Sequence, residues 1–245
     1  MTKNILWTGG WDSTFRVLDL VLIKNKKIQP HYILDHRRYS AEMELKTMEK
    51  IKQLIYEKKP AATSLILDTI VTDIRDIPAD KEITESYRSL ASLSHLGDQY
   101  DWLTRYVKHS NVSHLELCIH RDDKATGFLK KEVKKITTND DYYYVLKEDL
   151  SKPELKIFSY YHFPLFDLTK LDMEEIARKN DFRDIMEETW FCYYPTKDGK
   201  PCGLCNPCKY TRDEGLGRRV PAVTTYGKIR YNFLRLRNKV KNMLK

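Results

Sequence analysis

The strongest constraint on the fold is a Gly-Gly turn that joins a short apolar segment to an amphipathic one. Residues 4–7 (NILW) are predicted to form a strand, and apolar residues recur at helical spacing from Asp12 to Ile23. A strand that leads directly into a helix gathers backbone N–H groups at the helix N-terminus, where anions bind. Asp12, Ser13 and Thr14 would add hydroxyls for phosphate oxygens and a carboxylate for a metal ion. An ordinary turn capped by Asp12 or Ser13 is the alternative.

Strand-like and helix-like segments alternate after this turn. Strands are predicted at 31–36, 64–70 and 113–120, and helices at 41–58 and 98–109. This alternation predicts an α/β fold, with a Rossmann-like parallel sheet and helices on both faces. Residues 71–97 read as irregular, and 121–160 as a segment with a hairpin around DYYYV. A further helix is predicted to begin near Thr169 or Asp172, which could cap it.

Four cysteines indicate a metal site. Cys192, Cys202, Cys205 and Cys208 fall within 17 residues, and no recognisable export signal opens the sequence, so metal binding is favoured over disulfide bonds. Four thiolates can surround Zn²⁺ tetrahedrally and leave no position for a reactive water, which predicts a structural site. An iron–sulfur cluster would use the same ligands, and free thiols are the other alternative. Cys118, on an apolar strand, is predicted to be a buried, inert thiol.

The positive charge belongs to the tail. The formal net charge is +8, but nine Lys and Arg residues and no Asp or Glu follow Leu216, which leaves 34 basic and 35 acidic residues before it. We expect three parts: a nucleotide-binding α/β domain (1–188), a zinc-binding module (189–217) and a basic tail helix (218–245). The tail carries an apolar stripe at helical spacing, which is expected to dock on this chain or a partner: Ile229, Phe233, Leu236, Val240 and Met243.

Composition also limits the location and the partners. No run approaches the roughly 18 apolar residues of a membrane-spanning helix, so we expect no membrane span and a cytoplasmic protein. A homodimer is the default expectation for an enzyme of this kind. A contact of the basic tail with nucleic acid or protein is less favoured, since the charge lies outside the cysteine cluster. A zinc-bearing nucleic-acid-binding protein is nevertheless kept as the alternative to an enzyme, because the tail is basic.

The sequence Thr8-Gly9-Gly10-Trp11-Asp12-Ser13 resembles the Ser-Gly-Gly-x-Asp-Ser motif of the PP-loop ATP pyrophosphatases, with Thr8 in place of the first Ser. The resemblance implies a PP-loop (HUP-type) fold that grips the phosphates of ATP, with Mg²⁺, and transfers AMP to a substrate oxygen. Asp12 and Ser13 would be catalytic. The residues that would bind the nucleotide are Thr8, Gly9, Gly10, Asp12, Ser13 and Thr14. Members that thiolate tRNA with a cysteine pair fit poorly, because Cys118 alone lies outside the cluster.

A second resemblance joins the turn to the cysteines. The segment from FPLFDLTK to TWFCYYPTKDGKPCGLCNPCKYTRDEG is similar to the C-terminal part of the 7-cyano-7-deazaguanine synthase family, which serves queuosine biosynthesis. That family activates the carboxylate of 7-carboxy-7-deazaguanine with ATP and converts it, through an amide, to a nitrile with ammonia. LDHRRYSAEMELKTMEKI is also similar to that family, which implies catalytic roles for His36 and Arg38. A solvated basic turn is the alternative for these residues.

The middle of the chain departs from this family. SHLGDQYDWLTRY, residues 94–106, has no familiar counterpart, so a relative that acts on another carboxylate or RNA base, or makes an amide or conjugate, remains open. Ligands of open α/β sheets gather at the carboxyl ends of strands, which adds weaker candidates after the strand at 113–120. These candidates are His120, Arg121, Asp122 and Asp123.

Overall fold

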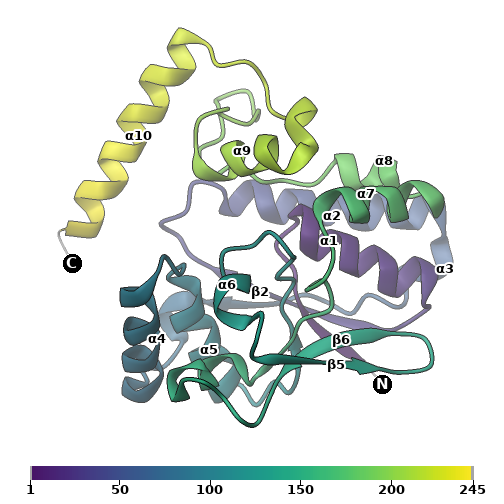
Figure 1. Ribbon diagram of the computed structural model, residues 1–245. Coiled ribbons are helices and arrows are strands. Elements are labelled where there is room, and N and C mark those ends of the chain that lie inside the picture. Colours follow the sequence, from purple (N-terminus) through teal and green to yellow (C-terminus); the bar gives the residue numbers. More distant parts are fainter. Residues whose placement is uncertain (1, 244–245) are drawn as a thin grey trace.

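A five-stranded parallel sheet forms the centre of the protein. The computed structural model describes the backbone of residues 2–243 and the side chains through residue 237. The strands lie in the order β3-β2-β1-β4-β7, so the order reverses between β1 and β4. Figure 1 shows the sheet region around β2 with helices packed around it. The predicted parallel sheet is thereby confirmed. The strands are β1 (Lys3–Leu6), β2 (Ile28–Leu34), β3 (Ile70–Asp73), β4 (Leu115–Glu116) and β7 (Tyr161–His162).

Helices cover both faces of the sheet, as predicted. One buried cluster includes Ile5, Phe15 and Phe182, and a second includes Leu103 and Phe158. The first lies under α1 (Trp11–Leu18) with its π-helical continuation η1 (Asp19–Ile23), α2 (Ala41–Lys58), α3 (Pro60–Thr63), α7 (Lys170–Lys179) and α8 (Arg183–Glu187). The second lies under α4 (Lys81–Leu93), α5 (Gln99–His109) and the 3-10 helix η3 (Pro153–Phe158). Each of these helices therefore buries its apolar face in one of the two clusters, and α7 and α8 reach the first cluster by packing on α1.

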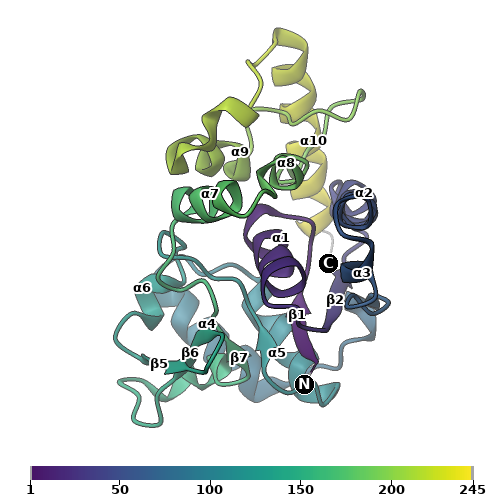
Figure 2. The same cartoon turned by 90° about the vertical axis from the view of Figure 1, so that its right-hand side faces the viewer.

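The other elements are short, except the last helix. They are the 3-10 helix η2 (Ile74–Asp76), α6 (Thr126–Leu129), β5 (Val133–Thr137), β6 (Tyr142–Leu146), α9 (Asn206–Thr211), the π-helical turn η4 (Arg212–Leu216), the 3-10 helix η5 (Gly217–Arg219) and α10 (Thr225–Met243). Figure 2 shows α9 and its neighbours next to α7 and α8.

Local sequence patterns predicted several details correctly. β5 and β6 form the antiparallel hairpin expected around residues 141–145, and Tyr144 bridges to Phe163 beside the end of β7. A capping box begins α7: the Thr169 hydroxyl accepts a hydrogen bond from the backbone N–H of Asp172, and the Asp172 carboxylate accepts one from that of Thr169. Both residues predicted as candidate caps therefore contribute to one helix start.

Two predictions of secondary structure were wrong. Residues 71–97, expected to be irregular, contain most of β3 and all of α4, whose N-cap Asp80 accepts a hydrogen bond from the N–H of Ile83. The α4 pattern is weak because its buried residues are Ile83 and Leu90. The strand expected at 64–70 begins instead at Ile70, since 64–69 pair with β2 only through an isolated bridge at Ile66.

The tail forms the predicted helix, but the described part of its apolar stripe does not dock on this chain, and docking on a partner stays a prediction. Ile229, Phe233 and Leu236 are 65%, 63% and 62% exposed, whereas Leu234 is 6% exposed. The helix meets the cysteine region through its other face, where Tyr231 packs edge-on against Tyr194. The side chains of Val240 and Met243 lie outside the described residues. Among residues 2–243, none of the helices has the length and apolar character that crossing a membrane requires.

Candidate functional site

The Gly-Gly turn between β1 and α1 has a shape that its sequence requires. Gly9 has φ +68°, and a Cβ there would lie 3.0 Å from the carbonyl oxygen of Glu44 and 3.1 Å from the Thr47 side chain. A larger residue would therefore be both strained and crowded. Gly10 is the N-cap of α1, and its carbonyl accepts the hydrogen bond from the Thr14 N–H at 3.0 Å. The backbone N–H groups that follow are the first of the helix and have no earlier carbonyl to bind.

The polar side chains of the turn divide into two groups. Ser13 accepts a 3.4 Å hydrogen bond from the backbone N–H of Thr8, and Asp12 keeps a buried Oδ1 without a hydrogen-bond partner among the described residues. Both residues line a cavity. Thr14 faces the interior instead: its side chain is fully buried, and its hydroxyl accepts a 3.0 Å hydrogen bond from the Trp7 indole. Thr14 was predicted to contact the nucleotide, but its side chain is buried under the turn and stabilises the turn through Trp7.

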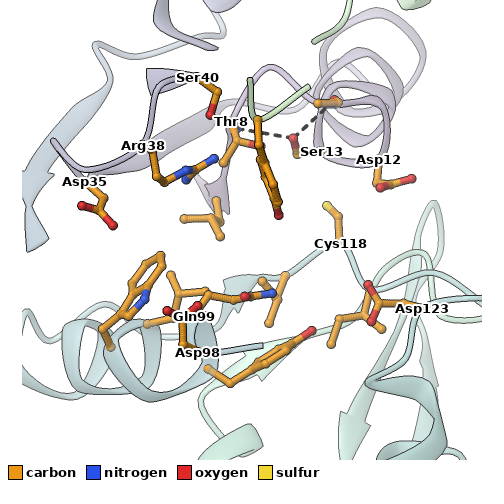
Figure 3. A pocket seen from close by; sticks show the side chains of 18 of the residues that line it. Thr8, Asp12, Ser13, Asp35, Arg38, Ser40, Asp98, Gln99, Cys118 and Asp123 are labelled. Atoms are coloured by element: carbon orange, nitrogen blue, oxygen red, sulfur yellow. Dashed lines mark hydrogen bonds between the residues drawn. The ribbon is translucent and has the colours of Figure 1, made fainter. Parts of the chain in front are cut away.

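The larger cavity lies at the carboxyl ends of β1, β2 and β4 and has a volume of about 470 Å³. This is the point where the strand order reverses, which is where open α/β sheets bind ligands. Figure 3 shows Thr8, Ser13, Arg38 and Ser40 on one side and Asp98 and Gln99 on the other.

Arg38 is held in the cavity by buried partners. Its guanidinium pairs with the carboxylate of Glu44, which is 4% exposed and also accepts hydrogen bonds from Ser40 at 2.8 Å and Tyr32 at 2.9 Å. Burial acts against the charge of Arg38, but the Glu44 carboxylate beside it leaves the pKa of Arg38 raised. Arg38 is thereby a fixed cation at the cavity wall.

The side chains of the two residues before Arg38 point in different directions. Arg37 also lines the cavity, and its guanidinium donates two hydrogen bonds to Asp35, at 2.8 and 2.7 Å. His36 points outward: its side chain is 56% exposed, and its Nε2 lies 2.8 Å from Asp73 at the end of β3. The structure therefore places Arg38, but not His36, with the other candidate residues.

A second cavity of about 240 Å³ adjoins the first. The two share five lining residues: Thr8, Gly10, Asp12, Arg38 and Tyr193. Lys170, the first residue of α7, also lines the second cavity, with its Nζ 3.8 Å from Asp12 Oδ2 and 2.7 Å from Glu214. Burial acts to lower the pKa of Lys170, but the carboxylates of Asp12 and Glu214 raise it above its usual value. Lys170 therefore carries a positive charge beside the turn at neutral pH.

One of the four weaker candidates after β4 reaches the larger cavity. Asp123 lines it, and burial raises the pKa of this carboxyl group. His120 is buried beneath, with its Nε2 3.8 Å from Glu214. Arg121 and Asp122 are exposed, and the guanidinium of Arg121 donates to the carbonyl of Asp167. Cys118 was predicted to be buried and inert; it is half-buried and lines the cavity, and desolvation raises the pKa of its thiol well above the usual value.

The opposite wall of the larger cavity comes from a segment that was predicted to be helical but was given no functional role. Five residues at the start of α5 line the larger cavity: Asp98, Gln99, Tyr100, Trp102 and Leu103. They belong to 94–106, the stretch without a familiar counterpart. The signal that could have identified them is compositional, since a Trp and a Tyr beside an Asp and a Gln combine flat apolar surfaces with hydrogen-bonding groups, as ligand pockets do.

The four cysteines converge as predicted. Their Sγ atoms all lie within 4.8 Å of one another, with Cys205 3.8 Å from Cys192 and 3.4 Å from Cys208, and Cys202 3.9 Å from Cys208. Four Zn–S bonds of about 2.3 Å in a tetrahedron put sulfurs about 3.8 Å apart, so the arrangement fits a zinc ion. The backbone N–H groups of Cys202 and Tyr194 point at Cys192 Sγ, at 3.1 and 3.3 Å, as expected around a thiolate. The cluster is therefore a candidate structural metal site.

The cysteine region is joined directly to the turn. The backbone N–H of Trp190 donates a 2.8 Å hydrogen bond to the carbonyl of Gly9, and the Trp190 indole donates to the carbonyl of Cys192 at 2.8 Å. Tyr193 continues this segment and lines both cavities. Residues 189–217 were predicted as a separate module, and they also form a wall of the candidate site.

Comparison with known proteins finds a partial match that includes the cysteine region. Residues 138–219, from the hairpin through the four cysteines, match the family model described as "Queuosine biosynthesis protein QueC". This region is QueC-like. In addition, 48 residues are 44% identical to 7-cyano-7-deazaguanine synthase of Rhizorhabdus wittichii, an alignment that covers 20% of each chain. The resemblance predicted from the sequence is therefore confirmed, and the match spans about a fifth of the length of that relative.

The QueC-like region accounts for part of the site. It contributes Lys170, the cysteines and the segment from Trp190 to Tyr193, whereas the turn, the Arg38 loop and the α5 wall lie before it. The two cavities are thus built where QueC-like and other parts of the chain meet.

Proposed function

We propose that this protein is an ATP-dependent carbon–nitrogen ligase with a PP-loop fold, of the 7-cyano-7-deazaguanine synthase type. The observation that carries the proposal is convergence: the QueC-like region brings Lys170 and Tyr193 to the Gly-Gly turn at the point where the strand order reverses. A nucleotide and a carboxylate substrate would then occupy adjoining cavities that share Asp12 and Arg38.

The turn suits a triphosphate with Mg²⁺. The N–H groups at the start of α1 and the hydroxyls of Thr8 and Ser13 would bind phosphate oxygens. Asp12, with a buried oxygen lacking a partner among the described residues, would help to hold the Mg²⁺ ion. That ion would offset phosphate charge. Lys170 would add a second positive charge on the same side of the turn.

Adenylylation explains why the reaction would need ATP. A carboxylate is a poor electrophile, and transfer of AMP to one of its oxygens supplies a leaving group that ammonia can displace. Most of the catalysis would come from positioning and from fixed charges, including that of Arg38, a cation that lines both cavities. A deazaguanine-type carboxylate is the favoured substrate, and a nitrile the favoured product. A different carboxylate, or an amide or conjugate, is the runner-up because the α5 wall lies outside the QueC-like region.

The deciding experiment uses purified, zinc-loaded protein with Mg·ATP, ammonium and 7-carboxy-7-deazaguanine, and follows AMP, pyrophosphate and the mass of the base. We expect AMP and the nitrile together, and no AMP from Asp12→Asn protein of unchanged zinc content and fold. AMP without a change in the base would keep the adenylylating reaction and move the search to other carboxylates. Undiminished turnover by Asp12→Asn would contradict the proposal, as would failure of the protein to bind ATP.

A further inference from the structure

We propose that Arg219 is a positioning residue, which holds the Gly9–Gly10 turn in its ligand-binding shape through Trp190 and Trp11. The proposal assigns a role to a residue that lies after the last cysteine and outside the sequence motifs discussed above. Its effect on ATP binding rests on the proposed function, whereas its effect on the turn itself does not.

Arg219 is enclosed by the segment that leads to the cysteines. Its side chain is 6% exposed, and one guanidinium nitrogen donates to the carbonyl oxygen of Thr189 at 2.6 Å and to the Thr189 hydroxyl at 2.8 Å. The same guanidinium lies 3.3 Å from the Glu187 carboxylate and 5.2 Å from the centre of the Phe191 ring. These contacts fix the backbone on both sides of Trp190.

The position of Trp190 matters because its backbone holds the turn. Its N–H donates to the carbonyl of Gly9 at 2.8 Å, and its own carbonyl would lie 3.6 Å from a Cβ at Gly10. The segment fixed by Arg219 is therefore hydrogen-bonded to Gly9 and lies beside Gly10. A shift of this segment would remove a hydrogen bond from Gly9, the residue of the turn that holds a positive φ.

A second contact runs directly to the helix. The guanidinium lies over the Trp11 ring, 4.9 Å from its centre, and Trp11 is the first residue of α1. Trp11 is 4% exposed, so the cation and the ring meet away from bulk water, where this interaction is strongest. Arg219 thus fixes the N-terminus of α1 as well as the segment beside the turn.

Arginine suits this position better than lysine. Its planar guanidinium can donate to Thr189 and Glu187 in one plane while its faces contact Trp11 and Phe191. Burial lowers the pKa of Arg219 to about 10, so the group is still charged at neutral pH. A lysine would keep the charge, but it would lose the paired N–H donors of the guanidinium and its flat contact with the aromatic rings of Trp11 and Phe191.

The test compares Arg219→Met and Arg219→Lys with a matched control, Arg218→Met. Arg218 is the adjacent residue and also pairs with Glu187, but its other partner is Glu174 of α7, and Arg218 lines neither cavity. Each protein is first checked for zinc content and thermal unfolding. Hydrogen exchange is then measured for peptides that cover residues 5–14 and 187–194 without nucleotide, and the Kd for Mg·ATP is measured by calorimetry.

We expect faster exchange of both peptides in Arg219→Met, and a Kd for ATP raised about tenfold, the size expected from losing a buried cation–π contact and a charged hydrogen bond. Zinc content should be unchanged, Arg219→Lys should recover part of the effect, and Arg218→Met should match wild type. Unchanged exchange in Arg219→Met would overturn the inference. Faster exchange in a protein whose wild type binds no ATP would support the positioning role and remove the proposed function instead.

Discussion

The ammonium group of Lys170 lies 3.8 Å from the carboxylate of Asp12, which joins the start of α7 to the start of α1. Both helices begin at the same cavity, and Glu214 lies on the other side of the ammonium at 2.7 Å. The arrangement puts one buried cation between two carboxylates, one of which belongs to the turn. An anionic ligand in the turn would bring its charge toward this ammonium.

Replacing Lys170 should therefore impair the proposed reaction more than the fold. We expect Lys170→Met to lower the rate of AMP formation about a hundredfold, the size typical of losing one fixed charge at a reacting phosphate. Initial rates at saturating ATP measure this. Because the pKa of Lys170 is raised, its charge should persist across pH 6–9 and add no step to the pH–rate profile. Lys179→Met, an exposed change on the same helix, should be silent; equal rates for the two variants would exclude the role.

Metal removal should destabilise the protein and loosen the site. Because Cys205 lies within 3.8 Å of two other thiols of the cluster, we expect Cys205→Ser to lose zinc and to unfold at a lower temperature. Cys118→Ala, outside the cluster, should keep its zinc. Because Trp190 ties the cysteine segment to Gly9, Mg·ATP should also slow the release of zinc to a chelator, since coupling between sites is reciprocal. Release rates independent of ATP would show that the two sites act separately.

The α5 wall should decide which substrate is accepted. Trp102 lines the larger cavity but not the smaller one. We expect Trp102→Ala to raise the KM for the carboxylate substrate about tenfold, through lost stacking with a flat ring, and to leave the Kd for ATP unchanged. Tyr56→Ala, an exposed aromatic change on α2, serves as the control. A larger effect on ATP than on the carboxylate would mean that the nucleotide base occupies this wall.

Acid should destabilise the protein through His31. This residue is 1% exposed, its ring nitrogens lie 2.7 Å from the Tyr106 hydroxyl and 3.1 Å from the Asn4 side chain, and burial lowers its pKa to about 4. The unfolded chain binds this proton near pH 6.5, so the contribution of His31 to stability is complete above that pH and is lost as the pH falls toward 4. Between pH 6.5 and 5 the loss is about 2 kcal/mol.

Urea unfolding at pH 7 and pH 5 measures this loss. His31→Gln, which cannot be protonated, should show a smaller difference between the two pH values, whereas the exposed His95→Gln should behave as wild type. If His31→Gln keeps the full pH dependence, the proton is taken up elsewhere in the unfolded chain.

Patterns confined to neighbouring residues were predictable from the sequence. The glycine turn, the hairpin, the capping box at Thr169 and the set of four cysteines each depend on residue types at fixed spacing. Such patterns arise because the geometry of the backbone, or of a metal ion, requires particular residue types at nearby positions in the sequence. For the same reason the alternation of strands and helices was sufficient to predict a parallel sheet flanked by helices.

The direction of a side chain was harder to predict. His36, Arg37 and Arg38 are consecutive, yet the first turns outward because Asp73 lies on the neighbouring strand, and the third turns inward because Glu44, which also accepts a hydrogen bond from Ser40, anchors it. Asp73 is 37 residues from His36, so no local pattern contains it, and although Glu44 is only six residues from Arg38, the spacing alone does not show that the two side chains pair. The meeting of Lys170 with Asp12 and the α5 wall were missed for the same reason, since each depends on how the chain crosses the sheet.

The hydrogen bond from Trp190 to Gly9 also limits how this protein can be divided. A fragment that ended at residue 188 would contain the whole glycine motif, but it would lack Tyr193 and Arg219 and so be missing walls of its own cavities. A cysteine module transplanted alone would likewise lose the surface against which it packs. The glycine motif therefore cannot be transferred to another protein on its own. A chimera of two relatives would have to take the turn and the cysteine segment from the same parent.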